Sequence, residues 1–148
     1  MQKKDNKKII IIQANYYQDI SQMLLDGAVA EIKNHDFEVI NVPGAFEIPS
    51  AINIIHNSEQ SDNIVGYIAL GCVIRGETSH YDYVCSESAR GINKLAIKYQ
   101  LPIGNGIITV ENKDQAKVRA DINQRNKGGF AARACLDMIK LKEKYDKK

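Results

Sequence analysis

One of the three histidines, His80, stands where a proton-transfer group could act on a bound substrate. It follows a short polar stretch, residues 75–79, which separates an apolar run at residues 66–74 from a helical pattern. Imidazole changes its charge near neutral pH and is therefore well suited to acid–base catalysis. A helix that opens behind a glycine-containing loop presents free backbone N–H groups and the positive end of its dipole, which favour phosphate. The sequence thus predicts an acid–base residue beside an anion site.

The polar stretch has the residues of a helix start but not of a known phosphate-loop motif. Thr78 and Ser79 are good N-cap residues, and Ser79 with Asp82 has the spacing of a capping box. The stretch fits no Walker pattern and lacks the lysine of that motif, so an ordinary strand-to-helix connection stays open beside an anion loop. Further on, the Gly-Asn-Gly stretch at residues 104–106 predicts either a close backbone approach to a ligand or a plain loop.

The spacing of the histidines and cysteines favours neither a metal site nor a Cys–His nucleophile pair, although such a pair is conceivable. The three histidines share no ligand spacing and no cysteine stands in a ligand pattern with them, so we expect no metal. Cys85 lies five residues beyond His80, which places the two on different sides of a helix. All three cysteines are interpreted as small buried residues of a reducing compartment: Cys72 on a strand, Cys85 and Cys135 on helices.

Composition predicts one domain with no membrane or nucleic-acid role. A chain of 148 residues has the usual size of a single domain and is long enough to bury a hydrophobic core. Charged residues make up 26% and nearly balance at +2. Lysines gather at both ends, so residues 1–7 and 142–148 are expected to be flexible basic tails. The apolar run at residues 9–12 is too short for a signal peptide or a membrane span, so we expect a soluble cytoplasmic protein.

Strand and helix patterns alternate along the chain. Strands are predicted at residues 8–14, 37–42, 66–74 and 106–110. Helices are predicted from residue 19 to about 34, 49 to about 56, 79 to about 99 and 111 to 119. A last helix begins at residue 126, with an apolar stripe at Ala131, Ala134, Cys135, Met138 and Ile139. Right-handed crossovers then give an α/β three-layer sandwich, a four-stranded parallel sheet flanked by helices with flavodoxin-like winding.

Six blocks of sequence carry a specific combination of motifs. They are residues 42–49 (VPGAFEIP), 71–85, 106–112 (GIITVEN), 115–116, 119–120 and 126–129 (NKGG). The most specific feature is a PGAFE turn followed by an IRG-x-T-x-HYDYVC loop and helix. On these blocks, which occur in the same order and cover nearly the whole chain, the protein resembles the 6,7-dimethyl-8-ribityllumazine synthase family.

The resemblance implies a transferase that acts in the penultimate step of riboflavin biosynthesis. Members join 5-amino-6-(D-ribitylamino)uracil to 3,4-dihydroxy-2-butanone 4-phosphate, and release phosphate and water, to form 6,7-dimethyl-8-ribityllumazine. The amine attacks the ketone to form an imine, phosphate leaves by elimination, and a second attack with loss of water closes the ring. The substrates supply both the amine and the electron-accepting imine, so no cofactor is expected.

The resemblance also implies roles for individual residues. His80 matches the family's proton-transfer histidine. The phosphate-contacting positions are matched by Glu77, Thr78 and Arg119, whose planar guanidinium suits bidentate anion binding. The positions that contact the ribitylaminouracil are matched by Tyr16, Ala45, Phe46, Glu47, Cys72, Val73, Ile74, Asn105 and Lys127.

Three positions depart from the family pattern. Tyr16 stands where Phe or Trp usually stacks on the pyrimidine, and its ring still stacks while adding a hydroxyl. Asn105 replaces a second aromatic residue contributed across the subunit interface, which leaves a backbone and amide contact in place of stacking. Phe130 replaces a commonly acidic residue, which removes a partner for Arg119 or Lys127 and leaves more positive charge in the pocket.

The resemblance finally implies a homopentamer with active sites between neighbouring chains, and a functional link to riboflavin synthase. Some relatives pack pentamers into a hollow capsid, and the Arg119–Lys127 connection has no insertion relative to the capsid-forming pattern. Two other hypotheses stay open. The first is a flavin-binding or storage protein, which would not need His80 beside the phosphate loop. The second is a flavodoxin-like electron carrier, which would have a hydroxyl-rich phosphate loop after its first strand; this chain lacks such a loop.

Overall fold

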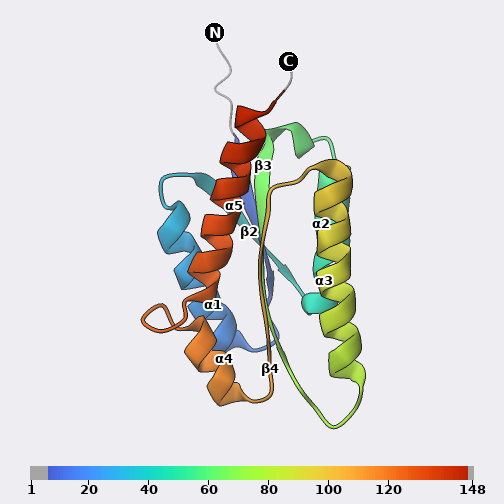
Figure 1. Ribbon diagram of the computed structural model, residues 1–148, viewed down its shortest axis with the longest axis vertical. Coiled ribbons are helices and arrows are strands. Elements are labelled where there is room, and N and C mark those ends of the chain that lie inside the picture. The colour runs from blue at the N-terminus through green and yellow to red at the C-terminus, as the bar shows by residue number, and fades with distance from the viewer. Residues whose placement is uncertain (1–6, 147–148) are drawn as a thin grey trace.

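Four parallel strands run through the middle of the computed structural model, which describes residues 7–146 (Figure 1). β1 (Lys8–Ala14) lies between β2 (Asp36–Val42) and β3 (Ile64–Ile74), and β4 (Ile103–Val110) pairs with the other side of β3. Every pairing is parallel, and the strand order β2-β1-β3-β4 is that of a flavodoxin-like sheet.

Helices cover both faces of this sheet (Figure 1). One face carries α1 (Gln18–Ile32), α4 (Lys113–Ala120) and α5 (Lys127–Lys144). The other face carries α2 (Ile48–His56) and α3 (His80–Tyr99). Two single 3₁₀ turns, η1 (Ala45–Glu47) and η2 (Ser61–Asn63), precede α2 and β3. The predicted α/β three-layer sandwich is confirmed.

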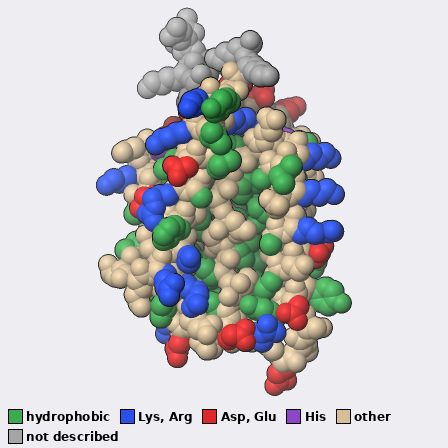
Figure 2. All heavy atoms as spheres, viewed as in Figure 1, with side chains coloured by type: hydrophobic (Ala, Val, Ile, Leu, Met, Phe, Trp, Pro, Cys, Tyr) green, Lys and Arg blue, Asp and Glu red, His purple; other side chains and the backbone are tan. Residues whose placement is uncertain are grey.

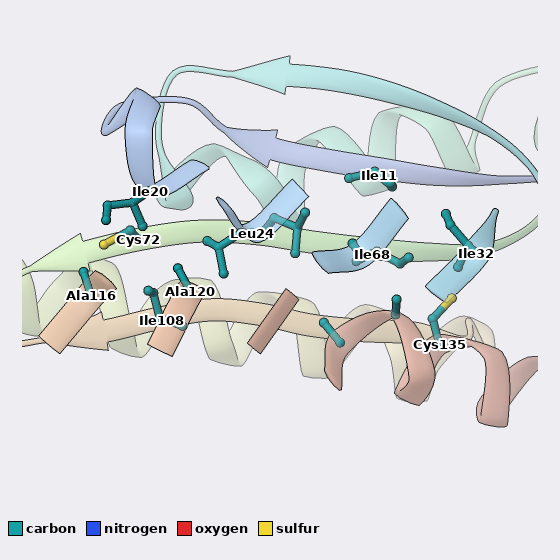
Figure 3. Close-up of a cluster of buried hydrophobic side chains, with 14 of the residues drawn as sticks. Ile11, Ile20, Leu24, Ile32, Ile68, Cys72, Ile108, Ala116, Ala120 and Cys135 are labelled. Atoms are coloured by element: carbon teal, nitrogen blue, oxygen red, sulfur yellow. The ribbon is translucent and has the colours of Figure 1, made fainter. Parts of the chain in front are cut away.

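The central strands are buried on both faces, which explains their largely apolar sequences, with Gln13 of β1 as a buried polar exception. In β1, Ile9 and Ile11 pack with α1 and α5, whereas Ile10 and Ile12 pack with α2 and α3, and all four are at most 1% exposed. Figure 3 shows the first of these two clusters, in which helix residues meet the sheet: Ile20, Leu24, Ile32, Ala116, Ala120 and Cys135.

The buried face of α5 differs from the predicted stripe. Ala134 and Met138 are exposed, whereas Ala132, which lay outside the predicted stripe, is buried. The reason is that α5 packs against α1 as well as against the sheet. A Cβ atom placed on Gly128 would lie 2.0 Å from the carbonyl oxygen of Leu24 in α1. Only glycine allows so close a contact between the two helices, and the buried face of α5 therefore points partly toward α1.

Some predicted boundaries also differ. β3 and β4 begin at Ile64 and Ile103, two and three residues earlier than predicted. α5 runs to Lys144, so residues 142–144 form its last turn instead of beginning a tail. Lys7, Tyr145 and Asp146 lie outside β1 and α5, and the other predicted tail positions, residues 1–6 and 147–148, lie outside the described residues.

Candidate active site

A pocket of about 330 Å³ opens at the carboxyl ends of β1 and β3. The chain leaves β1 toward β2 on one side and reaches β3 on the other, so the winding direction of the sheet changes between β1 and β3. Open α/β sheets bind ligands at such a switch point. The pocket is lined by Ala14, Tyr16, Tyr17, Gly44, Ala45, Phe46, Glu47, Cys72, Val73, Ile74, His80 and Val84.

Eight of the predicted site residues meet at this one pocket although they come from four separate segments. They are Tyr16 after β1, Ala45, Phe46 and Glu47 in η1, Cys72, Val73 and Ile74 at the end of β3, and His80 in α3. Sequence reasoning missed Ala14, Tyr17, Gly44 and Val84. Gly44 and Val84 lie inside the motif blocks named above, whereas the signal for Tyr17 and Ala14 is only that they lie one and two positions from Tyr16.

Two aromatic side chains are presented at the pocket. Tyr16 is 73% exposed and Phe46 is 50% exposed. The Tyr16 and Tyr17 rings meet edge to face, with centroids 4.9 Å apart and planes at 81°. Exposed aromatic faces in a pocket are suited to stacking on a planar heterocycle.

The η1 turn presents a carboxylate on the same side. The backbone N–H of Glu47 donates to the Gly44 carbonyl at 3.1 Å, which closes the turn after Pro43. Ala45 is buried beneath the turn while Glu47 is exposed. Within residues 7–146, no Lys, Arg or His side chain forms an ion pair with Glu47. Its oxygens are therefore free to accept hydrogen bonds from hydroxyl groups.

His80 is the first residue of α3 and is exposed at the pocket. Its backbone N–H donates to Thr78 Oγ1 at 3.3 Å. The predicted capping box is wrong, because Ser79 makes no side-chain cap and its ψ of 0° is not the extended conformation that aims an N-cap oxygen at the helix. The carboxylate of Asp82 lies instead 3.5 Å from Arg75 Nη1.

The cysteine beside the pocket is unsuited to nucleophilic attack. Burial raises the pKa of Cys72 to about 12, so it stays a neutral thiol near neutral pH. Cys135 is buried as predicted, whereas Cys85 is only half-buried, which corrects that interpretation. Burial also raises the pKa of Cys85, which favours its neutral thiol form.

Five predicted site residues do not line the pocket: Glu77, Thr78, Asn105, Arg119 and Lys127. The first two lie in the loop directly before His80 and are exposed. Asn105 is exposed on β4, where its Oδ1 accepts from the backbone N–H of Ile107 at 3.0 Å. The others come from α4 and from the first turn of α5.

Arg119 and Lys127, the two cations that do not line the pocket, have different surroundings. Arg119 is half-buried, and its Nη1 donates to the Gln115 carbonyl at 3.3 Å. Lys127 is exposed, with its Nζ 5.3 Å from the centre of the Phe130 ring. Arg133 Cζ lies 4.7 Å from that same ring. The π face of Phe130 thus contacts two cations, Lys127 and Arg133.

Other features of the described residues offer less chemistry. A second pocket, of about 180 Å³ near the amino-terminal ends of β3 and β4, contains none of the predicted site residues. In residues 7–146, no group of three or more His, Cys, Asp or Glu side chains is placed to hold a metal ion. Over the same range, every helix is too short or too polar to cross a membrane.

Comparison with known proteins gives consistent matches along the chain. A family model described as 6,7-dimethyl-8-ribityllumazine synthase matches residues 6–143. The protein of that name from Novosphingobium aromaticivorans is 50% identical over 140 residues, which cover 93% of this chain and 98% of the relative. Those from Bartonella tribocorum and Zymomonas mobilis are 46% and 50% identical, and the matches cover 98% and 93% of this chain and 97% of each relative.

Proposed function

The chain belongs to the 6,7-dimethyl-8-ribityllumazine synthase family, and from this premise we propose how its residues bind the two substrates and form the product. The enzyme performs the condensation step of riboflavin biosynthesis. In that step 5-amino-6-(D-ribitylamino)uracil and 3,4-dihydroxy-2-butanone 4-phosphate give 6,7-dimethyl-8-ribityllumazine, phosphate and water. The assignments below concern the site, the assembly and the surroundings of this reaction.

The pocket between β1, η1 and β3 binds the ribitylaminouracil. Its volume of about 330 Å³ suits a ligand of this size. Tyr16 and Phe46 present aromatic surface, and the pyrimidine stacks on Tyr16. The carboxylate of Glu47, which has no ion-pair partner among residues 7–146, accepts hydrogen bonds from the ribityl hydroxyls. Cys72, Val73 and Ile74, where β3 ends, offer backbone groups to the ring, and Ala45 packs beneath it.

His80 transfers protons during imine formation, elimination and ring closure. The supporting observation is that His80 lies both on the pocket and at the amino end of a 20-residue helix. The backbone N–H groups of Glu77 and Thr78, with the Thr78 hydroxyl, receive the phosphate of the second substrate. The bond between the substrate carbon and the phosphate oxygen then breaks beside His80, which can transfer the proton that this elimination requires.

Asn105, Arg119 and Lys127 act in the site of a neighbouring chain in a homopentamer. Two observations support this assignment. These residues do not line the pocket of their own chain, and they lie on β4, α4 and α5. β4 is also an edge strand, and Figure 2 shows a hollow between the α5 and α3 sides of the molecule with apolar side chains along it. An edge strand beside apolar surface calls for a covering partner.

The wider setting follows the same proposal. The chain folds as one domain, acts in the cytoplasm without a cofactor, and supplies its product to riboflavin synthase. Whether pentamers join into a capsid is a question for native mass spectrometry, which also counts the chains in the ring.

A direct assay with both substrates tests the proposal. Product appearance and phosphate release should rise together, in equal amounts, with purified protein and no added metal or cofactor. A flavin-binding or storage protein of the same fold would bind the pyrimidine without releasing phosphate. A monomer by native mass spectrometry would contradict the shared-site assignment.

A further inference from the structure

Arg75, the first residue after β3, is held by side chains from two different segments. Its Nε donates to both carboxylate oxygens of Glu111, at 2.9 and 3.2 Å. Its Nη1 lies 3.5 Å from Oδ1 of Asp82, and its Cζ lies 4.3 Å from the centre of the Tyr81 ring. One guanidinium therefore joins the first turn of α3 to the residue that follows β4.

The loop between Arg75 and His80 has few other anchors. Its residues 76–79 are all exposed, and a Cβ atom on Gly76 would meet nothing within 4 Å. Among the described residues, positions 76–79 hydrogen-bond only to the first turn of α3. The backbone N–H of Arg75 donates to the Val110 carbonyl at 2.9 Å. Besides α3, which packs on the sheet through Val84 and Ile92, Arg75 is thus the anchor of this loop to the rest of the described fold.

Glu111, the main partner of Arg75, is itself fixed by α4. Its backbone N–H donates to Gln115 Oε1 at 2.8 Å. Gln115 in turn donates its backbone N–H to the capping Asn112 at 2.9 Å, and its carbonyl accepts from Arg119. Arg75 therefore holds the loop against a point on the fold that has its own hydrogen-bonded support.

We propose that Arg75 is a positioning residue for the condensation, which through Glu111 and the first turn of α3 holds His80 and Thr78 at the pocket. The proposal rests on the roles assigned above to His80 and Thr78. Arg75 does not line the pocket, so its effect passes through these two residues. Small misplacements of reacting groups reduce rates strongly, whereas an exposed ion pair contributes little to folding. The expected effect is therefore on turnover more than on stability.

The test compares Arg75→Met, Glu111→Ala and the double variant by steady-state kinetics. Each single variant should lower kcat about 10- to 100-fold and raise KM for the butanone phosphate, with KM for the pyrimidine little changed. Because the two residues act through one contact, the double variant should fall no further than Arg75→Met. Arg75→Lys should restore only part of the rate, since an ammonium keeps the charge but not the fork or the stacking.

Arg90→Met is the matched control, because Arg90 lies in α3 ten residues after His80 and forms an exposed pair with Glu87 at 3.5 Å. It should behave as the wild type. A second readout is hydrogen exchange of the backbone amides at residues 76–80, which should become faster in Arg75→Met and not in Arg90→Met. Native mass spectrometry checks assembly, and if Arg75→Met fails to assemble, Glu111→Ala decides.

Three results would overturn the inference. The first is turnover of Arg75→Met or Glu111→Ala equal to that of Arg90→Met. The second is multiplied losses in the double variant, which would mean that Arg75 acts without Glu111. The third is wild-type turnover in His80→Ala, in which case the proposed site fails and this inference fails with it. A slow His80→Ala beside a fast Arg75→Met would overturn the positioning role alone.

Discussion

Gly104 in β4 lies directly against the backbone of Ala131 in α5. A Cβ atom added to Gly104 would come within 1.8 Å of the Ala131 carbonyl oxygen. Gly106 makes the next contact on the same face, where an added Cβ would lie 2.9 Å from the Ala131 Cβ. These contacts set how closely α5 approaches the sheet, and with it the position of Lys127 at the start of that helix.

Gly104→Ala should therefore destabilise the protein strongly. The obstructing atom is backbone and cannot rotate away, so the loss of unfolding free energy should reach or exceed the upper end of the roughly 1–3 kcal/mol typical of overpacking. Urea unfolding followed by circular dichroism measures it. Gly76→Ala is the control, because its added Cβ would meet nothing within 4 Å. Equal stability of the two variants would mean that β4 and α5 separate easily.

The same glycines show where sequence reasoning reaches its limit. Their spacing indicated that backbone comes close to something, and a ligand or a plain loop were the interpretations. The structure places α5 there instead, and the strand continues through both glycines. The spacing of the glycines indicates that something packs closely against the backbone, but it does not identify the partner, which comes from a distant part of the chain.

The fold class and most of the pocket residues were easier to predict from the sequence. β1 carries four consecutive isoleucines and β3 is apolar along its length because both of their faces are covered, so their pattern identifies them without knowledge of their neighbours. The pocket residues carry specific motifs at the ends of those strands. The contact of Arg75 with Glu111 had no such signal, since it joins residues 36 positions apart. The pairing of Asp82 with Arg75 was likewise missed, because the sequence placed Asp82 in a capping box.

His80→Ala should slow turnover while substrate binding stays nearly intact. General acid–base catalysis contributes roughly 10²–10⁴-fold, and the reactivity of the substrates themselves limits the loss. Steady-state kinetics on the assembled variant gives kcat, and equilibrium binding of the pyrimidine gives its affinity. His35→Ala, an exposed histidine beyond the end of α1, serves as the control. An unchanged kcat in assembled His80→Ala would rule out the proton-transfer role.

Arg119→Ala should raise KM for the phosphorylated substrate far more than KM for the pyrimidine. A hydrogen bond to a charged group contributes about 1.5–3 kcal/mol, which corresponds to roughly 10- to 100-fold in affinity. Lys117→Ala, an exposed cation on the same helix, is the control for loss of positive charge. Equal increases for both substrates would point to a defect of folding or assembly instead.

Stability should fall at alkaline pH because three buried groups hold their protons tightly. Burial raises the pKa of Tyr67, Cys72 and Cys135 to about 12, above ordinary values of 10.0 for Tyr and 9.0 for Cys. The folded state thus binds these protons more tightly than the unfolded state does. Their contribution to stability is complete below pH 9 and is lost as pH rises toward 12. Urea unfolding at a series of pH values should show this decline, and the free energy of unfolding should fall less steeply with pH in Cys135→Ala. An unfolding free energy that does not change between pH 9 and 12 would contradict the raised pKa values of these groups.

The final prediction concerns where one site ends and the next begins. If His80 and Arg119 serve a common site from two adjacent chains, a closed ring places each interface between the His80 side of one chain and the Arg119 side of its neighbour. His80→Ala and Arg119→Ala rings should each be poorly active. Co-assembly from denatured mixtures should restore activity, because some interfaces then join the intact side of one variant to the intact side of the other, beside interfaces that carry both defects. The His80→Ala, Arg119→Ala double variant mixed with inactive His80→Ala supplies the control, since no interface in those rings contains an intact His80. Mixed rings that form by mass spectrometry but show no more activity than their parents would place both residues in the site of a single chain.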